Sequence, residues 1–141
     1  MKQPEKVYLI DTNVILRYLL GDHQRFSPRA KIFMQDVATG IRKAEIPSVV
    51  IVECIYVLQK YYKIAKNEIV DALNRILNFK GIVNRNRSEI LSALIKFGET
   101  NIDIVDCILA AQSTPNKVIV SFDKDFSKLK AVSESICPPD E

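Results

Sequence analysis

Four acidic residues stand where a carboxylate is unusual unless it has a chemical role. Asp11 and Asp123 each come just after a β-branched apolar run, in "VYLIDTN" and "VIVSFD". Glu53 is the one charged residue in "IPSVVIVECIYVL", where an unpaired charge would cost several kcal/mol. Asp106 shares a helical face with Asp103 in "NIDIVDCILAA", because residues three apart are neighbours on a helix surface. Each segment is therefore expected to deliver a carboxylate to a cleft.

Converging carboxylates repel one another and raise each other's pKa unless a cation neutralises them. Hard oxygen ligands suit Mg²⁺ or Mn²⁺, whereas zinc prefers His and Cys, and this chain has only His23 and three scattered cysteines. A simpler interpretation makes Asp11, Asp103 and Asp123 helix caps and Glu53 a salt-bridged core charge. Taken together, the four acids favour a metal site.

The elements that would carry these acids alternate along the chain. Val7–Ile10 reads as a buried strand, followed by a helix that closes at Gly21. The residues from 23 to 40 predict a second helix, with Ser27 and Pro28 near its start. Residues 44–63 are ambiguous, because "VVIV" favours a strand while Pro47 and Ser48 resemble a helix start, and we interpret them as a helix.

The second half continues the alternation. Residues 66–79 form a clear amphipathic pattern with Asn67 as a possible cap, and a short strand is expected at 82–83. Helices are predicted within 86–100, ending near Gly98, and within 103–113, stopped by Pro115. A strand follows at 117–122, and the residues after Ala131 carry little signal. Such alternation predicts a parallel sheet with ligands at the carboxyl ends of its strands, where Asp11 and Asp123 fall.

Length and composition predict one soluble domain. The 141 residues are 48% hydrophobic and 26% charged, without repeats or linkers, so residues 1–141 are expected to form a single unit with a core of about 6–131 and a short C-terminal tail. No apolar run reaches the length of a membrane helix or signal peptide, which predicts a cytoplasmic protein without membrane contact. Cys54, Cys107 and Cys137 are expected to be reduced, small buried residues.

The segments "LIDTNVILRYLLGD", "IPSVVIVECIYVL", "DIVDCILAA" and "VSFDKDF" resemble the PIN domain ribonucleases, especially the VapC toxins of type II toxin-antitoxin systems. The resemblance spans nearly the whole chain, with all four acidic motifs in order. It implies a three-layer α/β/α fold with a five-stranded parallel sheet. It also implies an Mg²⁺- or Mn²⁺-dependent endoribonuclease, the toxin of a pair.

Carried over motif by motif, the resemblance implies that Asp11, Glu53, Asp106 and Asp123 are the catalytic residues and metal ligands. It implies supporting roles, as further acids or as groups that orient the carboxylates, for Thr12, Asn13, Asp103, Ser121 and Asp125. The partners that it implies are an RNA substrate, a cognate antitoxin protein and a second copy of the chain in a homodimer.

Setting the four acids aside raises the formal net charge of the remaining chain above its overall +3, so the surface beyond the cleft is expected to be basic. Basic side chains supply affinity for phosphates without sequence information. The candidate phosphate contacts are Arg17, Arg25, Arg29, Arg42, Lys43, Arg85 and Arg87. Aromatic residues that could join interfaces are Tyr18, Phe26, Tyr56, Tyr61 and Tyr62.

Two other functions remain open at this point. A catalytically silent PIN scaffold would bind RNA or a protein without cutting, which the intact acidic quartet argues against. A phosphoacceptor domain would use Asp11, but it would also need a further acidic pair near the N-terminus and a late lysine at a strand end. Metal-dependent cutting, or stable phosphorylation of Asp11, separates these readings.

Overall fold

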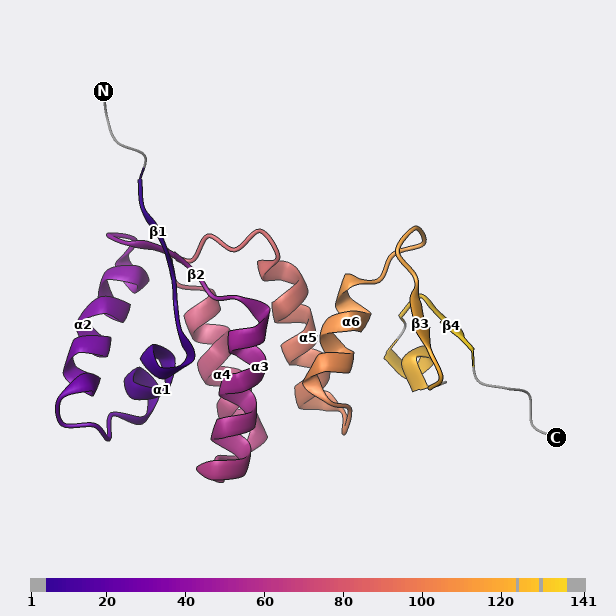
Figure 1. Cartoon of the computed structure of the whole chain (residues 1–141), viewed down its shortest axis with the longest axis horizontal. Helices are drawn as coiled ribbons and strands as arrows, with labels where there is room; N and C mark the ends of the chain where they lie inside the picture. Colours follow the sequence, from indigo (N-terminus) through magenta and orange to yellow (C-terminus); the bar gives the residue numbers. More distant parts are fainter. Residues whose placement is uncertain (1–4, 124, 130, 137–141) are drawn as a thin grey trace. The chain divides into compact units, whose positions relative to one another are not determined.

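The computed structural model describes residues 5–123, 125–129 and 131–136, except for the side chain of Asp125 (Figure 1). Two compact units divide the chain, Met1–Arg87 and Ser88–Glu141. The first contains β1 (Val7–Leu9), α1 (Thr12–Leu20), α2 (Phe26–Thr39), β2 (Lys43–Glu45), α3 (Ser48–Tyr56), the π-helix η1 (Val57–Tyr61) and α4 (Lys66–Leu77). The second contains α5 (Arg87–Glu99, which starts at the boundary), α6 (Ile104–Gln112), β3 (Ile119–Ser121), the 3₁₀ helix η2 (Asp125–Leu129) and β4 (Ser133–Ser135).

The first unit is built on a small parallel sheet. β1 pairs with β2 in register Tyr8 to Ala44, and Ala44 forms a parallel bridge to Ile82 on its other side. The amide side chain of Asn84 extends this pairing: its Nδ2 donates to the Ile46 carbonyl at 2.7 Å, and its Oδ1 accepts from the Ile46 N–H at 2.8 Å. Parallel strands need crossover connections, which α1 with α2 and α3 with α4 supply.

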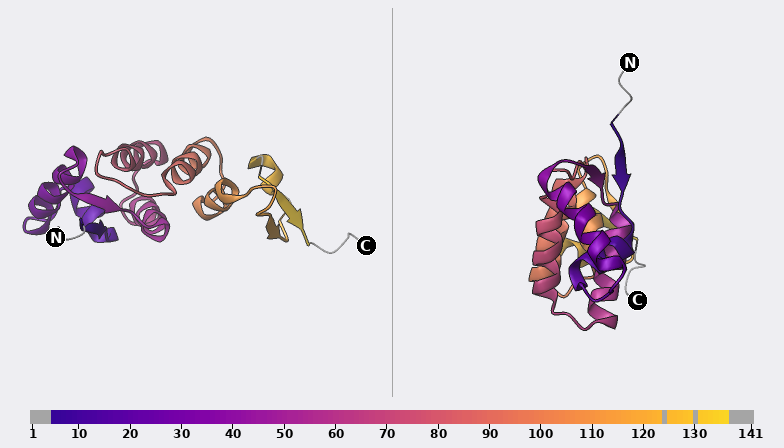
Figure 2. Two further views of the ribbon diagram at one scale, coloured as in Figure 1. Left: turned by 90° about the horizontal axis from the view of Figure 1, so that it is seen from above. Right: turned by 90° about the vertical axis from the view of Figure 1, so that its left-hand side faces the viewer.

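The helix ends in the first unit follow the predicted stop signals. Gly21 and Gly40 adopt left-handed φ values of 62° and 85° and close α1 and α2, as expected for glycine just past a helix end. α1 and α2 lie side by side (Figures 1 and 2). The fully buried side chains of this unit come from its helices and from residues beside its sheet, and include Ile15, Met34, Val37, Ile46, Ile51, Ile55, Leu73 and Ile82.

The ambiguous segment 44–63 is a helix from Ser48 onward, as predicted, but it begins after a strand that the sequence did not predict. β2 has one apolar residue, Ala44, so it lacks the alternation that marks a strand, and pairing on both sides creates it. At the other end η1 widens the helix, with the Tyr62 N–H bonded to the Val57 carbonyl at 3.2 Å. Lys63 then turns the chain with a positive φ of 56°.

Two boundary predictions in the middle of the chain are wrong. Ala65, rather than Asn67, is the N-cap of α4, although the amphipathic helix itself is confirmed. The strand expected at 82–83 is reduced to a bridge at Ile82. The bridge at Ile82 depends on pairing with Ala44, a contact between residues far apart in the sequence.

The second unit holds two helices and a second parallel pair. α5 runs through Gly98 to Glu99, one residue beyond the expected stop, and α6 follows the predicted pattern. β3 pairs in parallel with β4, a strand that the uninformative tail did not predict. Apolar side chains buried in this unit come from α5, α6 and η2, and include Ile90, Leu94, Phe97, Ile104, Cys107, Phe126 and Leu129.

The parallel α/β character is therefore confirmed. In the described residues the strands form one two-stranded sheet in each unit, together with the bridge at Ile82. None of the described helices is both long and apolar enough to cross a membrane.

Candidate functional site

Asp11 occupies the turn between β1 and α1. It is the N-cap residue of α1, with extended backbone angles of −78° and 156°, but its side chain makes no capping hydrogen bond. The side chain is exposed. The simpler interpretation of Asp11 as a helix cap therefore does not account for its carboxylate.

Thr12 connects this turn to α3. Its buried hydroxyl, in a residue that is 4% exposed, donates a hydrogen bond to Oε2 of Glu53 at 2.8 Å. Glu53 itself is exposed, so the expectation of a charge inside an apolar surround is wrong. Helical spacing explains the difference, because α3 buries Ile51, Cys54 and Ile55 and turns position 53 away from them. Thr12 thus fixes one orientation of the Glu53 carboxylate.

The charges of both acids of the first unit, Asp11 and Glu53, act on the thiol of Cys54. Burial raises its pKa to about 12, and the charges of Glu53 and Asp11 add to the effect. Both carboxylates therefore act on the same buried group. The thiol stays protonated near neutral pH, which agrees with the expected role of Cys54 as a small buried residue.

The second unit gathers three acids around one pocket of about 210 Å³. Asp103 and Asp106 come from the start of α6, and Asp123 follows β3. Asn101, Ile102, Phe126 and Leu129 complete the lining. Sequence reasoning missed these four, although Phe126 lies three residues after Asp123, where an apolar residue in a charged turn was the available signal.

Local hydrogen bonds hold two of these acids in place. Oδ1 of Asp103 accepts from the Val105 N–H at 2.8 Å, so Asp103 caps α6, as the simpler interpretation expected for this residue. The hydroxyl of Ser121 accepts from the Asp123 N–H at 2.9 Å and shapes the turn that presents this acid. Ser121 thus supports Asp123 through its backbone N–H.

Asp106 is the most perturbed acid of the pocket. Partial burial raises the pKa of its carboxyl, and the negative charges of Asp103 and Asp123 raise it further. It makes no ion pair with Lys or Arg in the described part of the chain. A cation in this pocket would offset the repulsion.

The donor chemistry fits a hard divalent cation. Carboxylate oxygens are the ligands that Mg²⁺ and Mn²⁺ prefer, and Mg²⁺ is commonly held by only one or two of them with substrate phosphates. The structure brings Asp11 and Glu53 together in the first unit, and Asp103, Asp106 and Asp123 in the second. Among residues 5–123, 125–129 and 131–136 no three His, Cys, Asp or Glu residues form a ready-made cage. Asn13 is exposed, and the Asp125 side chain and Cys137 lie outside the described residues.

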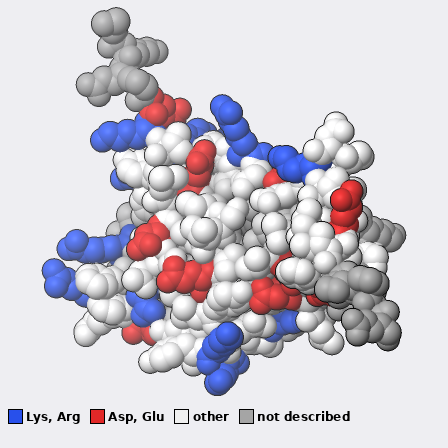
Figure 3. Space-filling view, turned by 45° about the vertical axis from the view of Figure 1, so that its right-hand side comes forward, with Lys and Arg blue, Asp and Glu red and all other residues white. Residues whose placement is uncertain are grey.

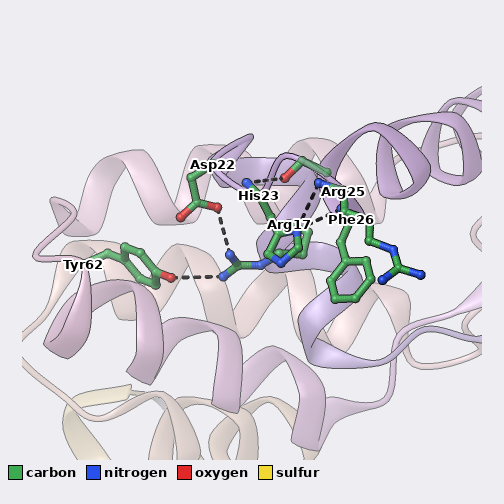
Figure 4. A network of polar contacts seen from close by, with 7 residues as sticks. Arg17, Asp22, His23, Arg25, Phe26 and Tyr62 are labelled. Carbon is green, nitrogen blue, oxygen red and sulfur yellow. Dashed lines mark hydrogen bonds and ion pairs between the residues drawn. The ribbon is translucent and has the colours of Figure 1, made fainter.

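The predicted phosphate contacts divide into two groups. Arg17 donates to Asp22 at 2.9 Å and to the Tyr62 hydroxyl at 3.0 Å (Figure 4), and the Tyr62 bond is the main cause of its raised pKa. Arg87 donates to the Ile82 carbonyl, and Arg42 bonds Asp36 and Tyr8. The guanidinium groups of these three arginines are held by hydrogen bonds within the protein. Lys43 is half-buried, and the exposed candidates are Arg25, Arg29 and Arg85.

Basic side chains reach the surface at several places, with acidic side chains between them (Figure 3). Among the predicted interface aromatics, Tyr61 is 77% exposed and Phe26 is 50% exposed, whereas Tyr18 packs edge-on against Phe79. Exposure therefore singles out Tyr61 and Phe26 as surface aromatics.

Comparison with known proteins adds two findings. The family model of the PIN domain matches residues 8–132. A protein of Aquifex aeolicus (strain VF5), called VapC ribonuclease, is 27% identical over 123 residues, which cover 86% of this chain and 90% of that protein.

Proposed function

Because the chain belongs to the PIN domain family, we propose that it is a metal-dependent endoribonuclease that hydrolyses phosphodiester bonds in RNA. The observation that carries the proposal is the pocket of the second unit, where burial and two neighbouring acids raise the pKa of Asp106. Carboxyl groups with perturbed pKa values are often found at functional sites. The likeness to a VapC ribonuclease supports the choice of RNA.

The proposed ligands of Mg²⁺ or Mn²⁺ are Asp11, Glu53, Asp106 and Asp123. We propose a single α/β/α domain with a five-stranded parallel sheet, in which these four carboxylates are the metal ligands. Thr12 supports the idea, since a hydroxyl that orients a ligating carboxylate is a typical second contact of a metal ligand. Asn13, Asp103, Ser121 and Asp125 are proposed as supporting residues.

Each part of the chain would have a separate task in the reaction. When bound, the metal would supply an activated water and offset negative charge on the phosphate. Thr12 holds Glu53 in one orientation, and Ser121 shapes the turn of Asp123. Asp103 caps α6 and adds negative charge beside Asp106. These contacts prepare the ligands before substrate arrives.

The contacts of His23, the single histidine, bear on whether water or the RNA 2′-hydroxyl attacks the phosphate. Cleavage through the RNA 2′-hydroxyl usually needs a general base such as histidine. Nδ1 of His23 accepts from the N–H groups of Phe26 at 2.9 Å and Arg25 at 3.3 Å, and its ring stacks on Phe26 at 4.3 Å. His23 therefore has a structural task at the start of α2. We expect attack by water and products with 5′-phosphate and 3′-hydroxyl ends.

The test is incubation of the purified chain with total cellular RNA in Mn²⁺, Mg²⁺ or EDTA, with new ends mapped by sequencing. The proposal expects cuts that require metal and leave 5′-phosphates. A substrate with one 2′-deoxy nucleotide before the scissile bond should also be cut. Cyclic 2′,3′-phosphate ends would overturn the hydrolytic route. Binding of RNA without metal-dependent cuts would instead favour the silent scaffold.

The proposal extends to biological role. We propose a toxin that a cognate antitoxin protein inhibits, that works as a homodimer and that acts on RNA in the cytoplasm. The likeness to a protein called VapC ribonuclease supports the toxin role. Coexpression with a candidate antitoxin protein, with cell growth and copurification as readouts, tests this part separately from the cleavage assay.

A further inference from the structure

A second pocket lies in the first unit, between β1, α1 and α2. Its volume is about 400 Å³, within the usual range for small-ligand sites. α2 contributes Phe26, Arg29, Ala30 and Phe33 at helical spacing, and α1 contributes Val14 and Arg17. Asp11 lines the same pocket.

We infer that this pocket binds the base of one nucleotide of a single-stranded RNA substrate, next to the scissile position, while Arg29 contacts the backbone phosphate. The inference rests on the proposed function, because Asp11 is there a metal ligand. It assigns a substrate-binding role to Phe26 and Arg29.

Phe26 forms an aromatic side of the pocket, and its ring is already stacked on His23. The Phe26 ring is 50% exposed, and the parallel His23 ring supports it at an interplanar angle of 6° (Figure 4). The Arg25 guanidinium lies 5.7 Å from the Phe26 centroid. Stacked planar groups with neighbouring arginines are the usual composition of sites that take up unpaired bases.

The charge at the rim favours a polyanion. Arg25 and Arg29 are exposed, and neither forms an ion pair with a residue that the structure describes. Arg17 differs, because Asp22 and Tyr62 hold its guanidinium and its side chain is only 18% exposed. Arg17 therefore forms a fixed part of the pocket wall. The exposed Arg25 and Arg29 are the arginines available to contact phosphate.

A protein segment is the alternative occupant, since the apolar lining would also accept aliphatic side chains. The observations favour RNA for two reasons. The exposed Arg29 lines the pocket together with Phe26, whose ring stacks on His23, and the pocket includes an acid from the proposed catalytic set. A nucleotide bound here would place its backbone beside Asp11.

The test measures binding without cleavage. Fluorescence anisotropy with a labelled, mixed-sequence single-stranded RNA in EDTA is applied to the full chain and to Phe26→Leu and Arg29→Gln. We expect Phe26→Leu to weaken binding about tenfold through lost stacking. Arg29→Gln should weaken binding and reduce the slope of log K against log salt by about 0.7, the loss of one phosphate contact. Both positions are exposed, so both variants should fold, and melting curves verify this.

Matched controls are Ile32→Ala, an exposed apolar residue of α2 outside the pocket, and Arg75→Gln, an exposed arginine of α4. Each should bind RNA within about twofold of the parent chain, a surface effect below roughly 0.5 kcal/mol.

The outcomes separate this inference from the proposed function. If the parent chain cuts RNA but both pocket variants bind normally, the inference is overturned and the function stands. If the variants lose RNA affinity as expected but the parent never cuts, the base-binding role of the pocket holds, while its place next to a scissile bond falls with the proposed function. Unchanged RNA affinity with lost affinity for the antitoxin would overturn the inference and assign the pocket to a protein.

Discussion

The two groups of acids are held in different ways. In the first unit, Glu53 accepts a hydrogen bond from a buried hydroxyl and both acids are exposed. In the second, Asp106 is partly buried, and two other acids raise its pKa. The protein orients the Glu53 carboxylate with a hydrogen bond, whereas it places the Asp106 carboxyl beside two other negative charges. An acidic side chain is therefore positioned by a hydrogen bond in the first unit, and it lies beside other negative charges in the second.

The largest expected effect tests whether both groups serve one reaction. Asp106→Asn and Glu53→Gln should each lower the cleavage rate by roughly 10²–10³-fold, because each removes a carboxylate proposed to hold the metal that would offset charge on the reacting phosphate. Metal-dependent cleavage of a labelled RNA, with folding checked by circular dichroism, measures this.

The matched controls are Asp71→Asn and Glu68→Gln, which change exposed acids of α4 and should keep the parent rate. Full activity of Glu53→Gln beside an inactive Asp106→Asn would restrict the site to the second unit.

A smaller effect is expected at Thr12. Thr12→Val keeps the shape but removes the hydroxyl that orients Glu53, so activity should fall about 10–100-fold, as for other residues that orient metal ligands. The free energy of unfolding should fall by about 1 kcal/mol. Thr12→Ser retains the hydroxyl and should recover most of the activity, which a purely steric role would not require.

Cys54 should matter for stability but not for activity. Cys54→Ala removes a fully buried sulfur, at a cost of roughly 1 kcal/mol in the free energy of unfolding, with cleavage unchanged. Because the native thiol has a pKa of about 12, iodoacetamide at neutral pH should modify it far more slowly than in denatured protein. Equal rates in the two states would contradict the burial of the Cys54 thiol.

The smallest effect is a pH dependence of stability. The ordinary pKa of an Asp carboxyl is 3.8, and folding raises that of Asp106. Above pH 3.8 and up to the raised value, the folded state binds more protons than the unfolded state, so this residue's contribution falls as pH rises. Asp106→Asn should therefore be slightly more stable than the parent at pH 7, with the difference shrinking as the pH falls through the raised pKa and absent below about pH 4. Denaturant titrations across this range, without divalent metal, measure it.

The sequence by itself determined most of the helices, among them α1 and α6, which lie next to proposed site acids. Apolar spacing marked α1, α2, α4 and α6, and Gly21 and Gly40 marked two of their ends, because local periodicity and φ preferences act within a few residues. It also selected the acids, since a carboxylate after an apolar run is conspicuous without any fold. Asp103 as the cap of α6 was one of its open alternatives.

Only the tertiary structure decided the contacts between distant residues. β2 and β4 have too few apolar side chains to be predicted as strands from the sequence, and they form because a neighbouring strand pairs with each of them. The exposure of Glu53 followed from which face of α3 is buried, not from its apolar neighbours in sequence. The bonds from Thr12 to Glu53 and from Arg17 to Tyr62 join residues 41 and 45 positions apart, and such pairs form only when packing brings their elements together.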